Sequence, residues 1–285
     1  MRIAPRIARP LGTMVAYGFP EKDVAHDLDL ARKMGATCLE ILPHWKSRPD
    51  PLSLRQQVED WGLTIHSAHG SWGGQSIAAA RVDLGSLDHE TRLASLDDIR
   101  RCVDWTRQAG GRHLVVHPGG LSDPADKFRR WDALVRSLGD LAGSAAESNI
   151  TLCVENMPPG VFPGSEMADL VAIVAEVDHP SVGLAMDTGH AHLVHSAPTE
   201  TLAAGSRLRT THVHDNHGRQ DVHLPPGQGT IDWVAWVEAL DEIGYQGPVM
   251  LECIRQIRDN PDCLTAEFLG LIHSIAGSEE TPRRP

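Results

Sequence analysis

The chain has 285 residues, of which 41% are hydrophobic and 22% are charged, and its formal net charge is −12. This composition is ordinary for a globular protein, and it excludes a disordered chain, a collagen-like fibre and a small disulfide-stapled domain. The acidic balance argues against a general binder of nucleic acids or anionic membranes, because phosphate groups are contacted by clustered Lys and Arg.

Eight short runs of apolar and β-branched residues predict β-strands, and stretches with helical spacing separate them. Leu28, Ala31 and Met34, for example, form one apolar stripe, and Gly35 follows at the position of a helix stop. In chain order the strands are predicted at 11–17, 37–42, 63–68, 112–117, 150–155, 182–187, 209–214 and 247–252.

Eight strand–helix repeats in about 250 residues are typical of a (β/α)8 TIM barrel, which is an α/β fold. The competing α/β fold, a doubly wound open sheet, is disfavoured because no G-x-G-x-x-G follows the first strand. The repeats also fill the chain evenly. We therefore predict a single TIM-barrel domain over 1–285, with loose termini at 1–9 and 277–285.

The five cysteines are scattered and form no C-x-x-C pair, which indicates reduced thiols and no Cys-type zinc site. The first residues include three arginines but no apolar segment behind them, so no signal peptide is apparent. No apolar run approaches the length of about 18 residues expected for a membrane span. We expect a soluble, cytoplasmic protein without a membrane partner.

Potential metal ligands end six consecutive predicted strands. The active site of a TIM barrel lies at the carboxyl ends of its strands, so these side chains should meet at one rim. Imidazole and carboxylate groups are common ligands of divalent metals. In strand order the residues are His66 and His69, His117, Glu155, Asp187 and His190, His212 and His214, and Glu252.

Some of these residues also have ordinary structural explanations. Asp187 could be the N-cap of the following helix. His212 and His214 lie two apart on one strand and face the same side, so one can bind metal while the other lines the pocket. Asp221 and His223 lie in a loop rich in Pro and Gly, where a second metal or substrate position competes with a simple turn.

The segments MDTGH (186–190) and HVHDN to DVHLPPGQGTIDW (212–233) resemble the xylose-isomerase-like TIM-barrel superfamily. That group includes sugar-phosphate isomerases and epimerases, ketose 3-epimerases, hydroxypyruvate isomerases, inosose-type dehydratases and isomerases, and endonuclease IV. The resemblance implies one divalent metal (Mn, Mg, Co or Zn) and no organic cofactor. Its ligands would be Glu155, Asp187, His214 and Glu252. Substrate contacts are expected from His190 and Arg219 by resemblance, from Trp72 as an apolar wall, and from His66.

The endonuclease IV branch of the superfamily offers an alternative, because its three-zinc site has nine ligands and the chain has a match for each. By this resemblance the first metal would take His69 (or His66 on the same strand), His117 and Glu155, the second the four ligands above, and the third His190, Asp221 and His223.

The main functional hypothesis is a metal-dependent isomerase or epimerase of a small keto-sugar, polyol or inosose. Glu155 and Glu252 would lie on opposite sides of the reacting carbon, one removing the α-proton and the other returning a proton. An inosose-type dehydratase would use nearly the same parts. The expected partner is a small carbohydrate, and formation of a homo-oligomer is an open alternative.

Two other hypotheses are disfavoured. A multi-zinc phosphodiester hydrolase would need a basic rim for DNA, but the loops at the rim contain few cations, so nucleic acid is not expected as a partner. A non-catalytic barrel with a residual metal site is disfavoured by the complete set of four ligands.

Overall fold

Eight parallel strands form a barrel in the computed structural model, which describes residues 8–73, 79–260, 262–264 and 266–272. Each strand from β1 to β6 pairs with the next along the chain, and β8 pairs with β1. A bridge between Val213 and Leu251 links the ends of β7 and β8. The prediction of a single (β/α)8 TIM barrel is confirmed. The strands are β1 (Leu11–Tyr17), β2 (Cys38–Pro43), β3 (Thr64–His69), β4 (His113–Val116), β5 (Thr151–Glu155), β6 (Val182–Asp187), β7 (Leu208–His212) and β8 (Val249–Leu251).

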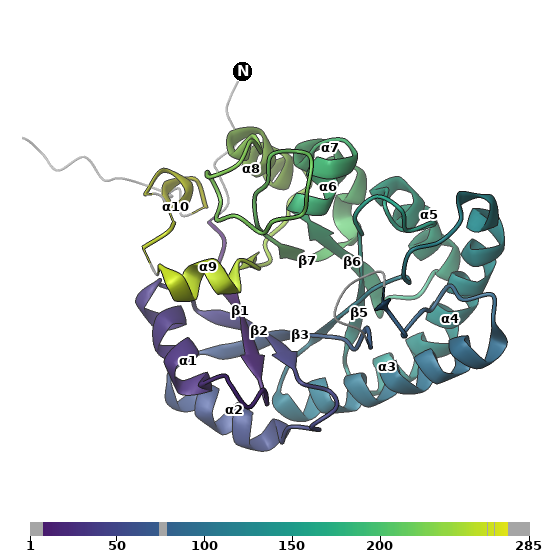
Figure 1. The fold of residues 1–285 in the computed structure, drawn as a ribbon, viewed down its shortest axis with the longest axis horizontal. Coiled ribbons are helices and arrows are strands. Elements are labelled where there is room, and N and C mark those ends of the chain that lie inside the picture. The colour runs from purple at the N-terminus through teal and green to yellow at the C-terminus, as the bar shows by residue number, and fades with distance from the viewer. Residues whose placement is uncertain (1–7, 74–78, 261, 265, 273–285) are drawn as a thin grey trace, which may run out of the picture.

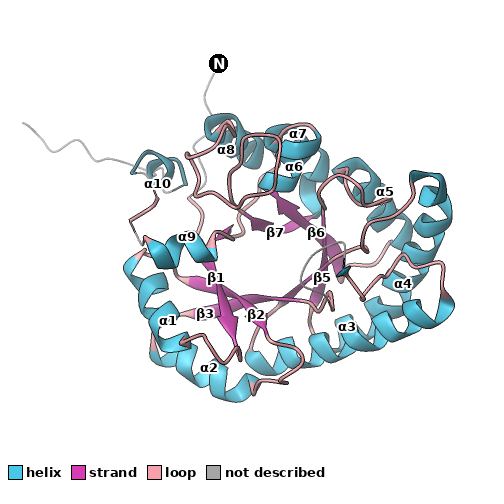
Figure 2. Ribbon diagram, viewed as in Figure 1, coloured by secondary structure: helices cyan, strands magenta, loops and turns pink. Residues whose placement is uncertain are grey.

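Helices surround this ring of strands, as Figure 1 and Figure 2 show. Aspartate N-caps start several of them. The Asp50 side chain, for example, accepts hydrogen bonds from two backbone N–H groups of the first turn of α2, which would otherwise lack partners. Gly110 ends α3 with a φ of 90°, a conformation that glycine adopts without steric cost. The α-helices are α1 (Val24–Lys33), α2 (Pro51–Asp60), α3 (His89–Ala109), α4 (Lys127–Glu147), α5 (Met167–Val177), α6 (Thr188–Val194), α7 (Ala197–Ala204), α8 (Trp233–Glu242), α9 (Ile254–Asp259) and α10 (Ala266–Ile272), and two short 3-10 helices are η2 (Pro124–Asp126) and η3 (Gly205–Arg207).

Alternate residues of the strands face two different environments. On β5, Val154 points outward into the main apolar core between the barrel and the helices, whereas Cys153 packs inside the barrel with Val115 and Ala185. Because side chains alternate along a strand, Glu155 shares the inward direction of Cys153. The last residue of β5 therefore presents its carboxylate above a small apolar layer inside the barrel.

The N-terminal segment is anchored at its end. The expectation of a loose segment over 1–9 is wrong at Arg9, whose buried side chain donates to Tyr245 O at 3.0 Å and to Asp241 Oδ1 at 2.7 Å. Most of the two termini expected to be loose, 1–7 and 277–285, lies outside the described residues. None of the helices in the described part of the chain combines the length and apolar character needed to cross a bilayer.

Candidate metal centre

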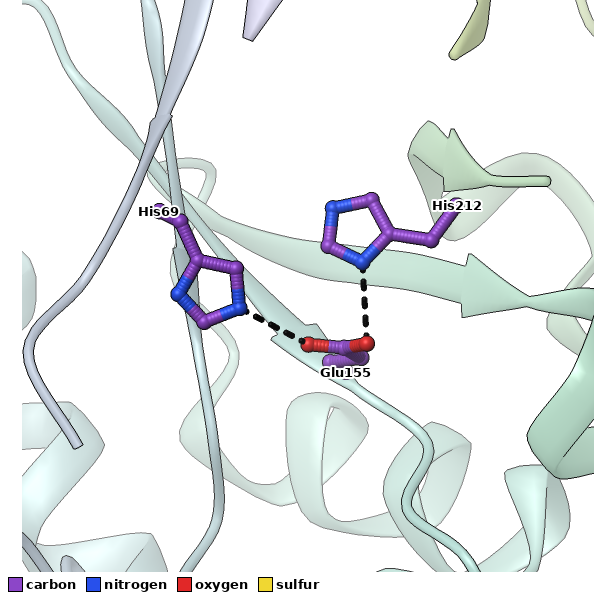
Figure 3. Close-up of side chains that lie close together, drawn as sticks. All are labelled: His69, Glu155 and His212. Carbon is purple, nitrogen blue, oxygen red and sulfur yellow. Dashed lines mark hydrogen bonds and ion pairs between the residues drawn. The ribbon is translucent and has the colours of Figure 1, made fainter. Parts of the chain in front are cut away.

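Glu155 lies at the centre of a cluster of buried histidines at the carboxyl ends of the strands. Its Oε1 lies 2.9 Å from His212 Nδ1, and its Oε2 lies 3.2 Å from His117 Nε2 and 3.6 Å from His69 Nε2. Figure 3 shows the rings of His69 and His212 reaching this carboxylate from β3 and β7. The barrel thus brings distant chain segments together at one side chain.

Glu252 follows β8 directly, and its Oε2 lies 3.1 Å from His212 Nδ1. Four residues each place one ligand atom within 4.8 Å of the other three: Glu155, Asp187, His212 and Glu252. This spacing is close to twice a metal–ligand distance of roughly 2.0–2.2 Å, so the four atoms can surround one ion. His214, which the family resemblance assigns to the metal, does not supply one of these four atoms and lies in a second group with Asp187.

The far side of His212 is held by residues that the sequence analysis missed. Its Nε2 lies 2.8 Å from Glu40 Oε1, and Ser67 Oγ donates to Glu40 Oε2 at 2.5 Å. A carboxylate on one ring nitrogen orients a histidine whose other nitrogen faces a metal site. The signal that could have revealed Glu40 is a single charged residue in the apolar run CLEIL, because a buried charge requires partners.

His214 belongs to a neighbouring group of ligands. Its Nε2 lies 3.1 Å from Asp187 Oδ2 and 3.7 Å from Asp221 Oδ1, while Asp221 Oδ2 lies 3.2 Å from the Nε2 atoms of both His190 and His223. Two further sets of three fit within 4.8 Å: Asp187, His190 and His214, and His214, Asp221 and His223. Asp187 therefore lies between the group of four and this second group.

Asp187 caps a helix and faces the cluster at the same time. Its Oδ1 accepts the backbone N–H of His190 at 2.7 Å at the start of α6, which leaves Oδ2 for the contact with His214. Gly189 is required beside them, because a Cβ at that position would overlap the His214 ring. One oxygen of Asp187 thus serves the cap and the other remains available for a metal.

The loop that carries Asp221 and His223 is folded around Asp215, a second residue that the sequence analysis missed. Asp215 is fully buried, and its backbone also pairs with Leu224 on the returning part of the loop. Its carboxylate accepts hydrogen bonds from the backbone N–H groups of Asn216 (2.9 Å), Gly227 (3.0 Å) and Ile231 (3.2 Å) and from the indole N–H of Trp233 (3.0 Å). The Asp215 carboxylate therefore anchors the loop that returns Asp221 and His223 to the cluster.

Neighbouring charges shift the pKa values of the cluster strongly. Burial alone would raise the pKa of Glu155, but the adjacent histidines, above all His212, lower it well below its ordinary range. Burial would likewise lower the pKa of His190, but Asp187 and Asp221 raise it to about 10. In the metal-free chain, Glu155 is therefore ionised and His190 is protonated near neutral pH. A metal ion must displace such protons when it binds.

The residues present fit a divalent metal. Glu155 Oε2 and Glu252 Oε2 are buried, and their contacts with His117 Nε2 at 3.2 Å and His212 Nδ1 at 3.1 Å lack hydrogen-bond geometry within the described part of the chain. Buried carboxylate oxygens without a hydrogen bond are costly, so these two oxygens are suited to bind a cation.

Three residues expected to contact substrate lie in different surroundings. The Trp72 ring packs against the cluster, with its centroid 4.9 Å from that of His69 and 5.8 Å from that of His117. His66 is not brought to the cluster: its ring stacks on His113 at 4.3 Å, because alternation along β3 turns it away from the direction of His69. Arg219 is exposed in the loop after β7.

Residues 28–271 match the family described as xylose isomerase-like TIM barrel. The chain is a member of this family. The family predicted from the sequence resemblance is therefore confirmed.

Several named relatives of the chain are sugar epimerases. The D-psicose 3-epimerase of Ruminiclostridium cellulolyticum is 26% identical over 253 residues, which cover 81% of this chain and 78% of the relative. The L-ribulose 3-epimerase of Methylomonas sp. is 29% identical over 231 residues, which cover 78% and 75%.

Solved structures support the fold. A D-tagatose 3-epimerase-like protein superposes with a TM-score of 0.73 at 21% identity, covering 92% of this chain and 98% of that one. The 3-keto-D-glucoside 4-epimerase of E. coli gives 0.71 at 22% identity, covering 94% and 100%.

Proposed function

We propose that the chain is a divalent-metal-dependent isomerase or epimerase of a small keto-sugar, polyol or inosose. The observation that carries this proposal is the approach of two carboxylates to one nitrogen: Glu155 Oε1 and Glu252 Oε2 lie 2.9 and 3.1 Å from His212 Nδ1. The two glutamates reach the rim from the ends of β5 and β8, and we place the substrate carbon between them. Epimerisation requires such a pair, because a proton leaves one face of the carbon and another arrives on the opposite face.

The group of four residues would hold the metal. Glu155, Asp187, His212 and Glu252 supply three carboxylates and one imidazole, a set that suits Mn²⁺, Mg²⁺, Co²⁺ or Zn²⁺. A bound divalent ion would polarise the substrate carbonyl and lower the cost of removing the adjacent proton.

The chain's own side chains would do the rest. One of Glu155 and Glu252 takes the α-proton and the other delivers a proton, a contribution of roughly 10²–10⁴-fold for well-placed carboxylates. His190 is oriented by the contact of its Nδ1 with Asn156 O at 2.8 Å, and its Nε2 would bind a substrate hydroxyl in place of its 3.2 Å contact with Asp221 Oδ2. Trp72 would exclude water from one side of the reacting carbon, since its ring packs on the cluster.

Metal-dependent phosphodiester hydrolysis of the endonuclease IV kind is the second candidate. It is favoured by the continuous cluster, in which His69 and His117 adjoin Glu155, and Asp221 joins His190 and His223. Two observations weigh against it: the net charge of −12, and the presence of sugar epimerases among the named relatives. A dehydratase of inososes would use the same residues but expel hydroxide instead of returning a proton.

Metal content and ketose turnover test the proposal together. The protein is purified without chelator, and its metals are counted by mass spectrometry. About one Mn, Co or Mg per chain, with interconversion of a ketose or inosose detected by NMR, is the expected result. Near three zinc ions per chain, with cleavage of a phosphodiester and no sugar interconversion, would overturn it in favour of the hydrolase.

The proposed partner is a small carbohydrate and the proposed location is the cytoplasm. All five cysteines are free and buried, which is the state expected in a reducing compartment.

A further inference from the structure

A cavity of about 470 Å³ opens beside the metal centre. This volume lies within the range of roughly 300–1,000 Å³ typical of small-molecule sites. Its walls come from the ends of β1 and β2 and from the segment that follows β3. The residues used below are Phe19, Trp45, Lys46, Trp72 and Arg81.

The cavity and the metal centre share a wall. The Trp72 ring lines the cavity and also packs edge-on against His69 and nearly parallel to His117, at interplanar angles of 76° and 24°. Trp45, a second wall residue, donates its indole N–H to His69 O at 3.2 Å. The cavity therefore adjoins the metal centre at Trp72.

Two cationic side chains line the cavity, Lys46 after β2 and Arg81 after β3. Neither forms an ion pair with any residue that the structure describes. Arg81 is held opposite Trp72 because its backbone N–H donates to Trp72 O at 2.9 Å. Gly73 permits this close approach, since a Cβ there would lie 2.9 Å from Arg81 Cβ.

We propose that the substrate carries an anionic group, a phosphate monoester or a carboxylate, at the end remote from its reacting carbonyl. Lys46 and Arg81 bind this group, while Trp45 and Trp72 pack against the carbon chain that connects it to the carbonyl. Phosphate and carboxylate oxygens accept the charge-assisted hydrogen bonds that Lys and Arg donate. This inference rests on the proposed sugar isomerase or epimerase function. This anion-binding pair could not be predicted from the sequence, because Lys46 and Arg81 lie 35 positions apart.

Turnover of matched sugars is the first test. Ketopentoses and ketohexoses are assayed as the free sugar, the terminal phosphate and the terminal carboxylate. One of the two anionic forms should have a kcat/KM at least about tenfold above that of the free sugar. Lys46→Met and Arg81→Met should each lower that ratio about tenfold, whereas the control Lys22→Met, an exposed lysine that does not line the cavity, should preserve it.

The form that is preferred distinguishes phosphate from carboxylate as the natural group. Turnover of free sugars with no gain for either anionic form would overturn the inference and leave the proposed function intact. Turnover of none of these sugars would count against the proposed function instead.

Binding of unreactive polyols tests the cavity independently of turnover. Sorbitol, sorbitol 6-phosphate and gluconate are titrated into the protein by calorimetry. At least one anionic polyol should bind about tenfold more tightly than sorbitol, and the Lys46→Met/Arg81→Met double variant should lose that difference. Equal binding of all three polyols to the wild-type chain would refute the anionic subsite whatever the activity.

Discussion

The buried carboxylate of Asp215 offers a sharp test of how the metal centre is assembled. The variant Asp215→Asn keeps the shape of the side chain but turns one acceptor oxygen into an N–H donor. If the amide replaces Oδ2, it faces the N–H groups of Gly227 and Trp233, and both hydrogen bonds are lost. A hydrogen bond to a charged group contributes about 1.5–3 kcal/mol, so the loss of two corresponds to about 3–6 kcal/mol. That is a large part of a typical unfolding free energy of about 5–15 kcal/mol.

The assay compares urea unfolding of the wild-type chain, Asp215→Asn and the control Asp232→Asn. Asp232 caps α8 through a single bond to the N–H of Ala235 at 3.0 Å, and asparagine caps helices about as well as aspartate. We expect a loss of at least about 3 kcal/mol for Asp215→Asn and less than about 0.5 kcal/mol for the control. Metal bound near Asp221 should fall in parallel, as measured by mass spectrometry after dialysis. Equal unfolding free energies for the two variants would refute the role of Asp215 as the loop anchor.

Three further predictions concern the cluster and its surroundings. Glu155→Gln and Glu252→Gln should each reduce turnover at least roughly 10²-fold with an unchanged circular dichroism spectrum, and near-normal turnover of either variant would contradict the two-carboxylate mechanism. His212→Ala should release the ion of the group of four, counted by mass spectrometry, whereas His214→Ala should retain it; the opposite result would return His214 to that group. Burial lowers the pKa of His66 from 6.5 to about 3, so the unfolded chain takes up a proton first and stability falls as pH drops below 6.5. Between pH 7.5 and pH 5 this costs about 2 kcal/mol, and His66→Gln should lose that much less unfolding free energy than wild type over the same interval.

The sequence predicted the barrel because its strands carry a local signal, a short apolar run at a regular interval. It also predicted that Glu155, Asp187 and Glu252 meet, because the fold places the carboxyl ends of all strands at one rim. The choice between His212 and His214 was left open by their spacing, since both face the same side of β7. The two histidines differ in position because β7 ends at His212, so His214 lies beyond the strand.

Glu40, Asp215 and Lys46 were missed for a different reason. Each acts through a partner that is distant in sequence: Glu40 through His212, Asp215 through the far end of its loop, and Lys46 through the cavity it shares with Arg81. No local pattern marks such a pairing. Only the lone charge of Glu40 within an apolar strand gave a hint.

A single β-bridge joins the ends of β7 and β8, whereas every other pair of neighbouring strands in the barrel is paired over several residues. The bridge of Val213 to Leu251 has backbone hydrogen bonds from Val213 N to Met250 O at 2.8 Å and from Glu252 N to Val213 O at 3.0 Å. The Thr211 hydroxyl adds two more, donated to Pro248 O at 3.0 Å and accepted from the Met250 N–H at 3.1 Å. His212 and Glu252 lie on either side of this β7–β8 contact, and an ion bound by both residues would link the two strands. A ligand that binds the folded state but not the unfolded state raises the stability of the fold. The ion that polarises the substrate would therefore also stabilise the closed barrel. Loss of the metal should therefore loosen the barrel first along this one edge.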